Sequence, residues 1–516
     1  GGSAAVTVSG ELRKWHRVTL TFDGPLGYTE TSTPNPFADC RLDVTFSSAT
    51  KSYLVPGFYA ADGNAENTGA SSGNKWRVHF APDEATTWTW SASFVTGTDI
   101  AINRATAGTP HASIHGLTGS FVVEESNKKG RDHRYHGRLD YVGERYLRFA
   151  DSGKYFMKVG PDSPETYLVY DDFDGTPDLQ RKSWSAHVQD FEEGDPTWMG
   201  GKGKGIIGAV NYISDKGMNV QSFITMNLRG YGRGAYVFIS SNLNDTKITD
   251  DDFKRFDVSK LAQWEIVFEH MDRKGLFLHF KTQEHHNDDL LTLDERFLYY
   301  RELVARFSHH LALNWNIGEE NTNTPEERLQ FAWEFRTLDC YNHTIVLHTF
   351  PWRYNEGFLP ILEDFNRTGD SPYTGFSFQI HIGNLQGFLE TWLERTTAVG
   401  RPMVMSVDEL GPWRYGVYPD VNTTDHDDRR ERFLWSAMMS GAMTETYFGF
   451  DFECNDINCE DLRSRDVWWD QCRYAREFFE KYIRFWKGAP ARELSSTEED
   501  LVFRVPGETI AVYMGI

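Results

Sequence analysis

Short apolar stretches that alternate with polar positions dominate the first quarter of the chain. They include WHRVTLTF, CRLDVTFSS, KWRVHFAP and TWTWSASFV, and turn residues such as glycine, proline and aspartate separate them. A period of two places every second side chain on one face of a strand, so each stretch predicts a strand that is buried on one side. We therefore predict an all-β sandwich over residues 1–125, followed by a polar linker over residues 126–144.

The pattern of hydrophobic and polar residues changes near residue 145, where apolar strands begin to alternate with amphipathic helical stretches. We predict eight strands, namely YFMKVG, VQSFITM, GLFLHFK, LALNWNIG, TIVLHTF, GFSFQIHI, PMVMSV and TETYFGF. Such alternation is typical of βαβ units, and eight units over residues 145–487 favour a (β/α)8 TIM barrel. A doubly wound open sheet is the alternative, but no G-x-G-x-x-G follows an early strand. Residues 488–516 predict a short C-terminal β-segment, so the chain is expected to be multidomain.

Composition and charge narrow the classes of partner. The formal net charge of the 516-residue chain is −22, which argues against nucleic acid, because phosphate binding needs a basic surface. Aromatic residues make up 15% of the chain and include 16 Trp; their flat faces can stack on sugar rings. No apolar run approaches the roughly 18 to 20 residues of a membrane span. We therefore expect a soluble protein with no membrane or nucleic acid partner.

The N-terminal residues and the cysteines lead to two further expectations, one about a signal peptide and one about a disulfide. The first ten residues, GGSAAVTVSG, carry neither a basic n-region nor an apolar h-region, so we expect that any signal peptide has already been removed. The chain has five cysteines, of which Cys454 and Cys459 enclose a short loop. We favour a disulfide between these two residues over a metal site, because no second Cys or His pair lies nearby at zinc-like spacing.

Carboxylates follow two of the predicted strands at the point where a barrel enzyme carries its chemistry. The fourth strand ends in WNIGEEN, with Glu319 and Glu320, and the seventh ends in MSVDELGP, with Asp408 and Glu409. Acids at the ends of strands 4 and 7 face each other across a barrel and can bracket a glycosidic bond. Retaining hydrolysis needs such a pair, one ionised for attack and one protonated to assist departure of the leaving group.

These two motifs resemble those of a known group. WNIGEEN resembles the W-x-x-G-N-E strand-4 motif of clan A retaining glycoside hydrolases, and SVDELG resembles their T-E-F-G strand-7 motif. The resemblance implies that Glu320 is the acid/base and Glu409 the nucleophile. Glu319 stands where that clan usually has an Asn that contacts the sugar 2-hydroxyl, so we expect it to bind substrate. The departure from Asn leaves open whether Glu319 or Glu320 donates the proton.

The resemblance extends over most of the chain. The N-terminal stretches FYAADG and WRVHFAPDEATTWTW resemble a domain of unknown function that precedes such barrels, and the GEEN and DELG motifs resemble the marine β-carrageenase family. This implies a secreted, periplasmic or cell-surface enzyme that hydrolyses a β-linked algal galactan of the carrageenan type, in the endo mode. The expected partner is the polysaccharide, and no cofactor or metal is expected. The oligomeric state stays open.

Polar and aromatic residues at other strand ends are candidate substrate contacts. We expect His381 to hold the nucleophile, because it directly follows FSFQI, where clan A enzymes often have His or Tyr. Tryptophans are expected to stack on sugars, and arginines to bind sulfate or carboxylate groups. A core or loop role is the alternative for each histidine. The further candidates are Arg229, His279, His285, His348, Trp352, Arg353 and Trp413, with Trp184 as another possible stacking platform.

Three alternatives complete the predictions. Glu284, His285 and His286 in EHHND resemble metal ligands, but adjacent side chains on an extended strand face opposite ways, so we do not favour metal catalysis. A polysaccharide lyase would use a Tyr or His base and would release an unsaturated product. An inactive carbohydrate-binding barrel is the third alternative, and the pair of strand-end glutamates argues against it.

Overall fold

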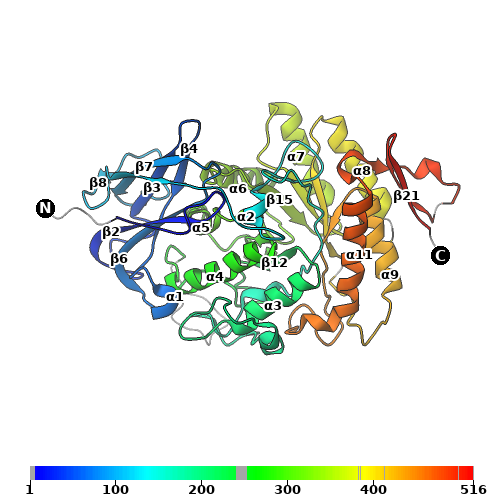
Figure 1. The fold of residues 1–516 in the computed structure, drawn as a ribbon, viewed down its shortest axis with the longest axis horizontal. Helices are drawn as coiled ribbons and strands as arrows, with labels where there is room; N and C mark the ends of the chain where they lie inside the picture. The colour runs from blue at the N-terminus through cyan, green and yellow to red at the C-terminus, as the bar shows by residue number, and fades with distance from the viewer. Residues whose placement is uncertain are drawn as a thin grey trace.

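The computed structural model describes residues 6–239, 253–381, 383, 385–411, 413–497 and 499–514. In Figure 1 the chain runs from a β-domain at one end, through a body of strands and helices, to a β-hairpin at the other end. The prediction of several domains, with an all-β N-terminal part, is confirmed.

Two antiparallel sheets form the N-terminal domain. The strands show the predicted alternation; in β3, for example, every second side chain is buried. Trp76 on β6 packs edge to face against Phe94 on β7, with ring centroids 4.8 Å apart, so aromatic side chains join the two sheets. The elements are β1 (Val6–Ser9), β2 (Val18–Thr29), β3 (Cys40–Ser47), β4 (Ser52–Pro56), β5 (Phe58–Tyr59), α1 (Ala65–Thr68), β6 (Ser72–Phe80), β7 (Thr87–Thr96), β8 (Thr109–Pro110) and β9 (Thr118–Val122).

A short connecting region follows, with α2 (His133–His136), β10 (Leu139–Asp140) and β11 (Arg148–Phe149). A parallel sheet of seven strands comes next, in sequential order. The strands are β12 (Val220–Ile224), β13 (Phe277–Lys281), β14 (Leu313–Asn316), β15 (Thr344–Thr349), β16 (Gly375–Ile380), β17 (Val404–Leu410) and β18 (Met443–Thr444). All of their side chains are buried, as expected for a sheet covered on both faces.

Helices separate these strands, as the sequence predicts. They are α3 (Lys204–Asp215), α4 (Val258–Lys274), α5 (Leu293–Phe307), α6 (Pro325–Leu338), α7 (Tyr354–Thr368), α8 (Leu385–Ala398), α9 (Asp427–Arg429), α10 (Ser436–Met439) and α11 (Asp466–Tyr482). Thr292 before α5 and Thr324 before α6 each form a capping box with the glutamate three residues later. These caps fix where the loops after β13 and β14 end and their helices begin.

The first predicted strand, YFMKVG, is not a regular strand. Its backbone nevertheless bonds to both edges of the sheet: Asn219 N–H donates to Val159 at 2.9 Å, and Thr446 N–H donates to Gly160 at 2.8 Å. Val159 N–H, however, donates to the Asn219 side chain at 2.8 Å and not to the backbone of a neighbouring strand, so the ladder is irregular here. The structure therefore shows a curled sheet of seven strands in place of the eight that we predicted.

The C-terminal residues form a small antiparallel sheet, as predicted, with β19 (Ala489–Pro490), β20 (Leu501–Val505) and β21 (Thr509–Tyr513). The ring of Tyr513 stacks on Trp435, which joins this sheet to the helices beside it. The predicted disulfide is not formed, because all five cysteines are free. Instead, a hydrogen bond with Cys459 lowers the pKa of the Cys454 thiol to about 7. Within the described part of the chain, no helix is long and apolar enough to cross a membrane.

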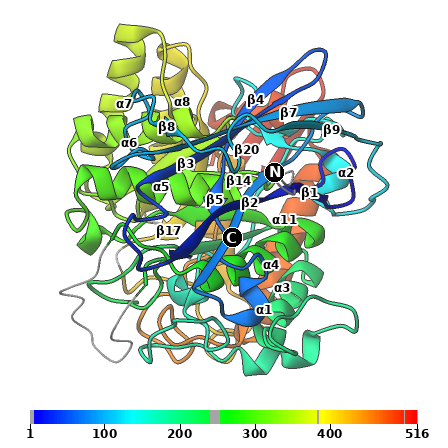
Figure 2. The ribbon, with the colours of Figure 1, turned by 90° about the vertical axis from the view of Figure 1, so that its left-hand side faces the viewer.

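The N-terminal domain packs against α4 and α5 (Figures 1 and 2). Arg17 from this domain forms ion pairs with Glu265 and Glu269 of α4. Glu265 also contacts His309 at 2.9 Å and His310 at 3.0 Å. Burial would raise the pKa of Glu265, but the two histidines and Arg17 hold it well below its usual range. A buried charged cluster therefore joins the two domains.

The domain contact leads to a stability prediction. Glu265→Gln removes a nearly buried carboxylate that Arg17, His309 and His310 share, and leaves Arg17 with Glu269 and His310 with Asp272. Because loss of one partner from a buried ion pair typically costs about 3 kcal/mol or more, we expect urea unfolding to show a decrease of that order. The control is Glu477→Gln, which removes a half-exposed partner 3.8 Å from Arg473 and should cost less than about 1 kcal/mol. Equal losses in the two variants would contradict this role for Glu265.

Candidate active site

One amide nitrogen holds the two predicted catalytic glutamates together. Gln379 on β16 donates from Nε2 to Glu320 Oε1 at 3.0 Å and to Glu409 Oε1 at 2.6 Å. Glu320 follows β14 and Glu409 lies on β17, so three strands meet here. Because a single atom contacts both oxygens, they can be no farther apart than the sum of the two distances, about 5.6 Å.

Glu409 is almost fully buried, with 4% of its surface exposed. Burial, together with the negative charges of Glu319 and Glu320, raises its pKa well above the usual range. Its neighbour Asp408 turns to other partners, namely Lys158 at 3.0 Å and the hydroxyl of Ser377 at 2.5 Å. Glu409 is thus the residue of DELG that lies beside the strand-4 glutamates.

Glu319 and Glu320 lie in different surroundings although they are consecutive. Glu319 is buried and forms an ion pair with Lys281. Burial would raise its pKa, but Lys281 and His348 lower it to about 2, so Glu319 stays ionised and is a poor proton donor. Glu320 has a left-handed φ of 46° and a partly exposed side chain that reaches Gln379. The geometry therefore favours Glu320 as the residue that exchanges protons with a ligand.

His285 lies against Glu320, with its Nδ1 3.1 Å from Glu320 Oε2, and it also pairs with Glu284. Burial alone would lower the pKa of His285, but these two carboxylates raise it to about 10. His286 Nδ1 contacts the same Glu284 at 2.7 Å.

The sequence argument that His285 and His286 face opposite ways is wrong, because they lie in the short 3-10 helix η3 (His285–Asn287) and not on an extended strand. The possible ligand atoms of Glu284, His285 and His286 lie within 4.8 Å of one another, so this group could also hold a metal ion.

The other predicted histidines occupy three different positions. His348 is buried, accepts a hydrogen bond from Glu320 N–H at 2.9 Å, and lies 3.6 Å from carboxylate oxygens of Glu319 and Glu409. His279 is fully buried and contacts Glu445 at 2.9 Å, which corrects its prediction as a substrate contact. His381 is exposed, and the β16 side chain that contacts Glu409 is Gln379, two residues earlier.

Exposed aromatic rings lie near the carboxylates. Trp352 is 63% exposed and stacks on Phe350, whose ring lies 4.9 Å from His285. Trp413 is 50% exposed and lies 6.0 Å from Phe450, which in turn neighbours Tyr231. Trp184, by contrast, is fully buried and offers no stacking surface.

The side chains of Arg229 and Arg353, which we predict to bind anionic groups of the substrate, are 54% and 40% exposed. Each already has a carboxylate neighbour: Arg229 lies 3.4 Å from Asp289, and Arg353 lies 3.0 Å from Glu356. An anionic ligand would therefore compete with an existing ion pair at either residue.

Sequence reasoning missed several residues of this site. Gln379 gave no signal, because one glutamine within an apolar strand is consistent with many roles. Lys281 did give one, since a lysine at the end of the buried strand FLHFK must find a carboxylate partner. Tyr231, 72% exposed in the glycine-rich stretch LRGYGRG after β12, could also have been identified from its place at a strand end.

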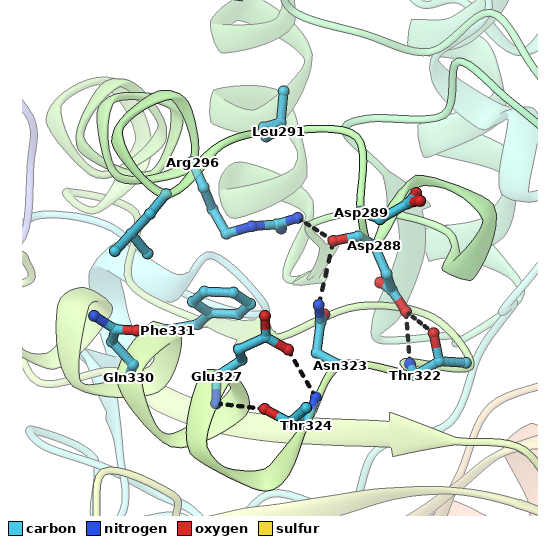
Figure 3. Close-up of a pocket in the computed structure, with 11 residues that line it drawn as sticks. Asp288, Asp289, Leu291, Arg296, Thr322, Asn323, Thr324, Glu327, Gln330 and Phe331 are labelled. Carbon is cyan, nitrogen blue, oxygen red and sulfur yellow. Dashed lines mark hydrogen bonds between the residues drawn. The ribbon is translucent and has the colours of Figure 1, made fainter.

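A separate cavity of about 500 Å³ opens at the beginnings of α5 and α6 (Figure 3). In Figure 3 the Arg296 side chain points to the backbone oxygen of Asp288, at 2.7 Å, and Thr322 points to the Asp288 carboxylate. The two predicted catalytic glutamates do not line this cavity. Its hydrogen bonds join the loop after β13 to the loop after β14, and so hold the segments that carry His285 and Glu320.

Comparisons with known proteins place the fold. A family model described as a domain of unknown function, DUF5060, matches residues 11–95, which confirms the predicted kind of N-terminal domain. No curated protein matches the chain. The chain is similar to a Bacteroides vulgatus protein of known structure described as a "putative glycoside hydrolase", with a TM-score of 0.63 and 16% identity over 96% of this chain and 82% of that one. At this identity the likeness is one of fold.

Two further solved structures are similar over large parts of their length. A glycoside hydrolase family 5 protein from Bacteroides vulgatus has a TM-score of 0.47 and 15% identity over 73% of this chain and 80% of that one. A Bacteroides ovatus family 5 xyloglucanase has a TM-score of 0.36 and 10% identity over 90% of this chain and 100% of that one.

The contacts of His285 lead to a prediction that needs no assay of activity. Glu284→Gln removes one of the two carboxylates that favour the imidazolium, so the pKa of His285 should fall from about 10 toward its usual value. An NMR titration of protein with labelled histidine would measure it, and His285→Gln would assign the signal. A His285 that already titrates near its usual value in the unaltered protein would contradict the ion pairs described here.

Proposed function

We propose that the protein is a retaining glycoside hydrolase that cleaves β-glycosidic bonds in a polysaccharide. One observation carries the proposal: the shared contacts of Gln379 keep oxygens of Glu320 and Glu409 within about 5.6 Å of each other. Retaining enzymes hold their two carboxyl groups about 5 to 5.5 Å apart, whereas inverting enzymes leave about 6.5 to 9.5 Å for a water molecule. The spacing suits direct attack by one carboxylate.

In the proposed mechanism, Glu409 and Glu320 have separate roles. Glu409, once ionised, attacks the anomeric carbon and forms a glycosyl-enzyme bond, while Glu320 gives its proton to the departing oxygen. Glu320, now ionised, then takes a proton from water, and that water displaces Glu409 and regenerates both groups. Glu319 remains ionised beside Lys281 throughout and takes no part in proton transfer.

The same proposal includes the shape of the catalytic domain. We infer a (β/α)8 barrel in which the irregular segment that contains Val159 and Gly160 takes the place of the first strand, because it bonds to both edges of the seven-stranded sheet. Carboxylates from β14 and β17 would then face each other across the barrel mouth.

For the substrate we propose an algal galactan of the carrageenan type, cleaved in the endo mode by a secreted, periplasmic or cell-surface enzyme. The support is the resemblance of GEEN and DELG to the β-carrageenase family. Exposed rings in the loops after β12, β15 and β17 also suit a polymer, because each can stack on a sugar face. Trp352, Trp413 and Tyr231 are the rings that we expect to touch it.

Two substitutions separate the proposed roles. Glu320→Gln and Glu409→Gln should each lower turnover of the polysaccharide by about 10²-fold or more, with unchanged circular dichroism. A glycoside with a dinitrophenolate leaving group needs no acid, so Glu320→Gln should still form the glycosyl-enzyme from it, whereas Glu409→Gln should not. Glu326→Gln, at an exposed position on α6, is the control. Full activity in either active-site variant would remove that residue from the mechanism.

Stereochemistry tests the reaction class. We expect hydrolysis within a panel of β-carrageenan, κ-carrageenan, furcellaran, agarose and porphyran, with β-carrageenan preferred. Proton NMR of the first product should show the β-anomer before mutarotation, because two displacements at one carbon restore its configuration. An α-anomer would overturn the retaining mechanism, and an unsaturated product would indicate a lyase. No turnover of any galactan would reject the proposed substrate.

A further inference from the structure

A buried lysine pairs with Glu319, the residue that precedes the proposed acid/base Glu320. Lys281, the last residue of β13, is fully buried, and its ammonium lies 2.7 Å from Asp162 and also pairs with Glu319. Asp162 is fully buried too. Taking an ammonium out of water is costly, so a lysine persists at such a position only with close anionic partners.

The surroundings of Lys281 and Glu409 are rich in acids. Lys281 stabilises the negative charge of Glu319. A carboxylate oxygen of Glu319 lies within 4.8 Å of one of Glu409, so its charge raises the pKa of Glu409. Two other cations contact acids of this region: His285 pairs with Glu320, and Lys158 pairs with Asp408. The titratable groups that face this region, from each element around it, are Asp162, Glu165, His279, Lys281, Glu284, His285, Glu319, Glu320, His348, Asp408, Glu445, Tyr447 and Asp456.

An attacking carboxylate must be ionised, and most of these neighbours oppose that. Burial and the charges of Glu319, Glu320 and Glu165 all raise the pKa of Glu409, and Lys281 lowers it. Lys281 also lowers the pKa of Glu319, which fixes one negative charge next to Glu409. Lys281 and Glu319 therefore act on Glu409 in opposite directions.

We propose that Lys281 is a positioning residue whose ammonium, held between Asp162 and Glu319, keeps a negative charge on Glu409 available for attack. This rests on the proposed function, because it gives Lys281 a part in that reaction. Lys281 does not itself touch the substrate in this proposal. It acts on Glu409 through its positive charge, and Asp162 and Glu319 hold the ammonium in place.

A purely structural role for Lys281 gives a different expectation. A lysine that only neutralised buried acids would affect stability and would leave the pH dependence of the reaction unchanged. Lys158 offers a matched control, because it is also buried and pairs with two carboxylates, those of Asp408 and Glu445. Unlike Lys281, it is not among the groups that shift the pKa of Glu409 most. Substitution of Lys158 therefore shows the effect of losing any buried cation, and substitution of Lys281 shows the additional effect of losing the cation that acts on Glu409.

The test measures kcat/KM against pH. The substrate is a 2,4-dinitrophenyl glycoside of the disaccharide unit of whichever polymer is cleaved. Its leaving group needs no acid, so the decrease of kcat/KM at low pH reports the ionisation of Glu409 alone. This decrease is the acid limb of the pH profile. Lys281→Met should move that limb to higher pH by about 1 unit or more, and Glu319→Gln should move it to lower pH. Lys158→Met should leave it in place, and Lys281→Arg should restore it in part.

A second measurement stands apart from activity and covers a variant that folds poorly. With glutamate labelled at the carboxyl carbon, NMR should show Glu409 titrating at higher pH in Lys281→Met and at lower pH in Glu319→Gln, with Glu409→Gln assigning the signal. If Lys281→Met does not fold, Lys281→Gln replaces it in both measurements, because Glu319→Gln removes a neighbouring acid and does not by itself test Lys281.

The outcomes distinguish the two proposals. No shift in either experiment, or a shift in the same direction in both variants, overturns the role of Lys281 whatever the activity. If the NMR shifts appear but no glycoside is cleaved, the proposed function fails while the charge assignment stands.

Discussion

The arrangement of the site depends on one hydrogen-bond donor shared by two acids. Gln379 offers its amide to Glu320 and Glu409 at once. It donates to both carboxyls without adding a charge, although each hydrogen bond is stronger to an ionised carboxylate. The register between β16 and β17 shifts at this point, so Gln379 pairs with Glu409 while Phe378 pairs with Val407. Such a bulge re-aims side chains at the end of a strand. A local irregularity of the sheet thus sets the distance on which the proposed chemistry depends.

Charge in the buried sheet is organised in two levels. Near the proposed active site Lys281 is paired with Asp162 and Glu319, and deeper in the sheet Lys158 is paired with Asp408 and Glu445. His279 contacts Glu445 and the side chain of Asn316, which places a neutral hydrogen-bonding group between the two levels. Hydrophobic side chains would fill the same space at lower cost in desolvation. The proposed control of the charge on Glu409 gives a reason why Lys281, Asp162 and Glu319 are charged and not hydrophobic.

The sequence predicted the features that depend on hydrophobic periodicity and on position at a strand end. Six strands, the helices between them and the glutamates of GEEN and DELG lie where expected, because burial and backbone hydrogen bonding constrain them strongly. The predicted strand TETYFGF matches less well, since β18 shares only Thr444 with it. The first strand failed, since Val159 N–H donates to the side chain of Asn219, a contact that hydrophobicity alone does not predict. His279 lies inside the sheet against Glu445, whereas His381 is exposed, because the sequence pattern does not say whether a polar side chain faces the interior or solvent. Gln379 went unnoticed, since its role follows from the register between strands, which no single strand contains.

The N-terminal domain connects to this site through the elements that it touches. Its Arg17 reaches Glu265 on α4, and Glu265 in turn holds His309 and His310, a few residues before β14. His310 also binds Asp272 near the end of α4, a few residues before β13. The domain contact therefore fixes the entry points of the two strands that end at Lys281 and just before Glu319. Because interiors are close-packed, a shift at one end of such short strands is felt at the other. The β-domain thus helps to hold the register on which the pairing of Lys281 with Glu319 depends.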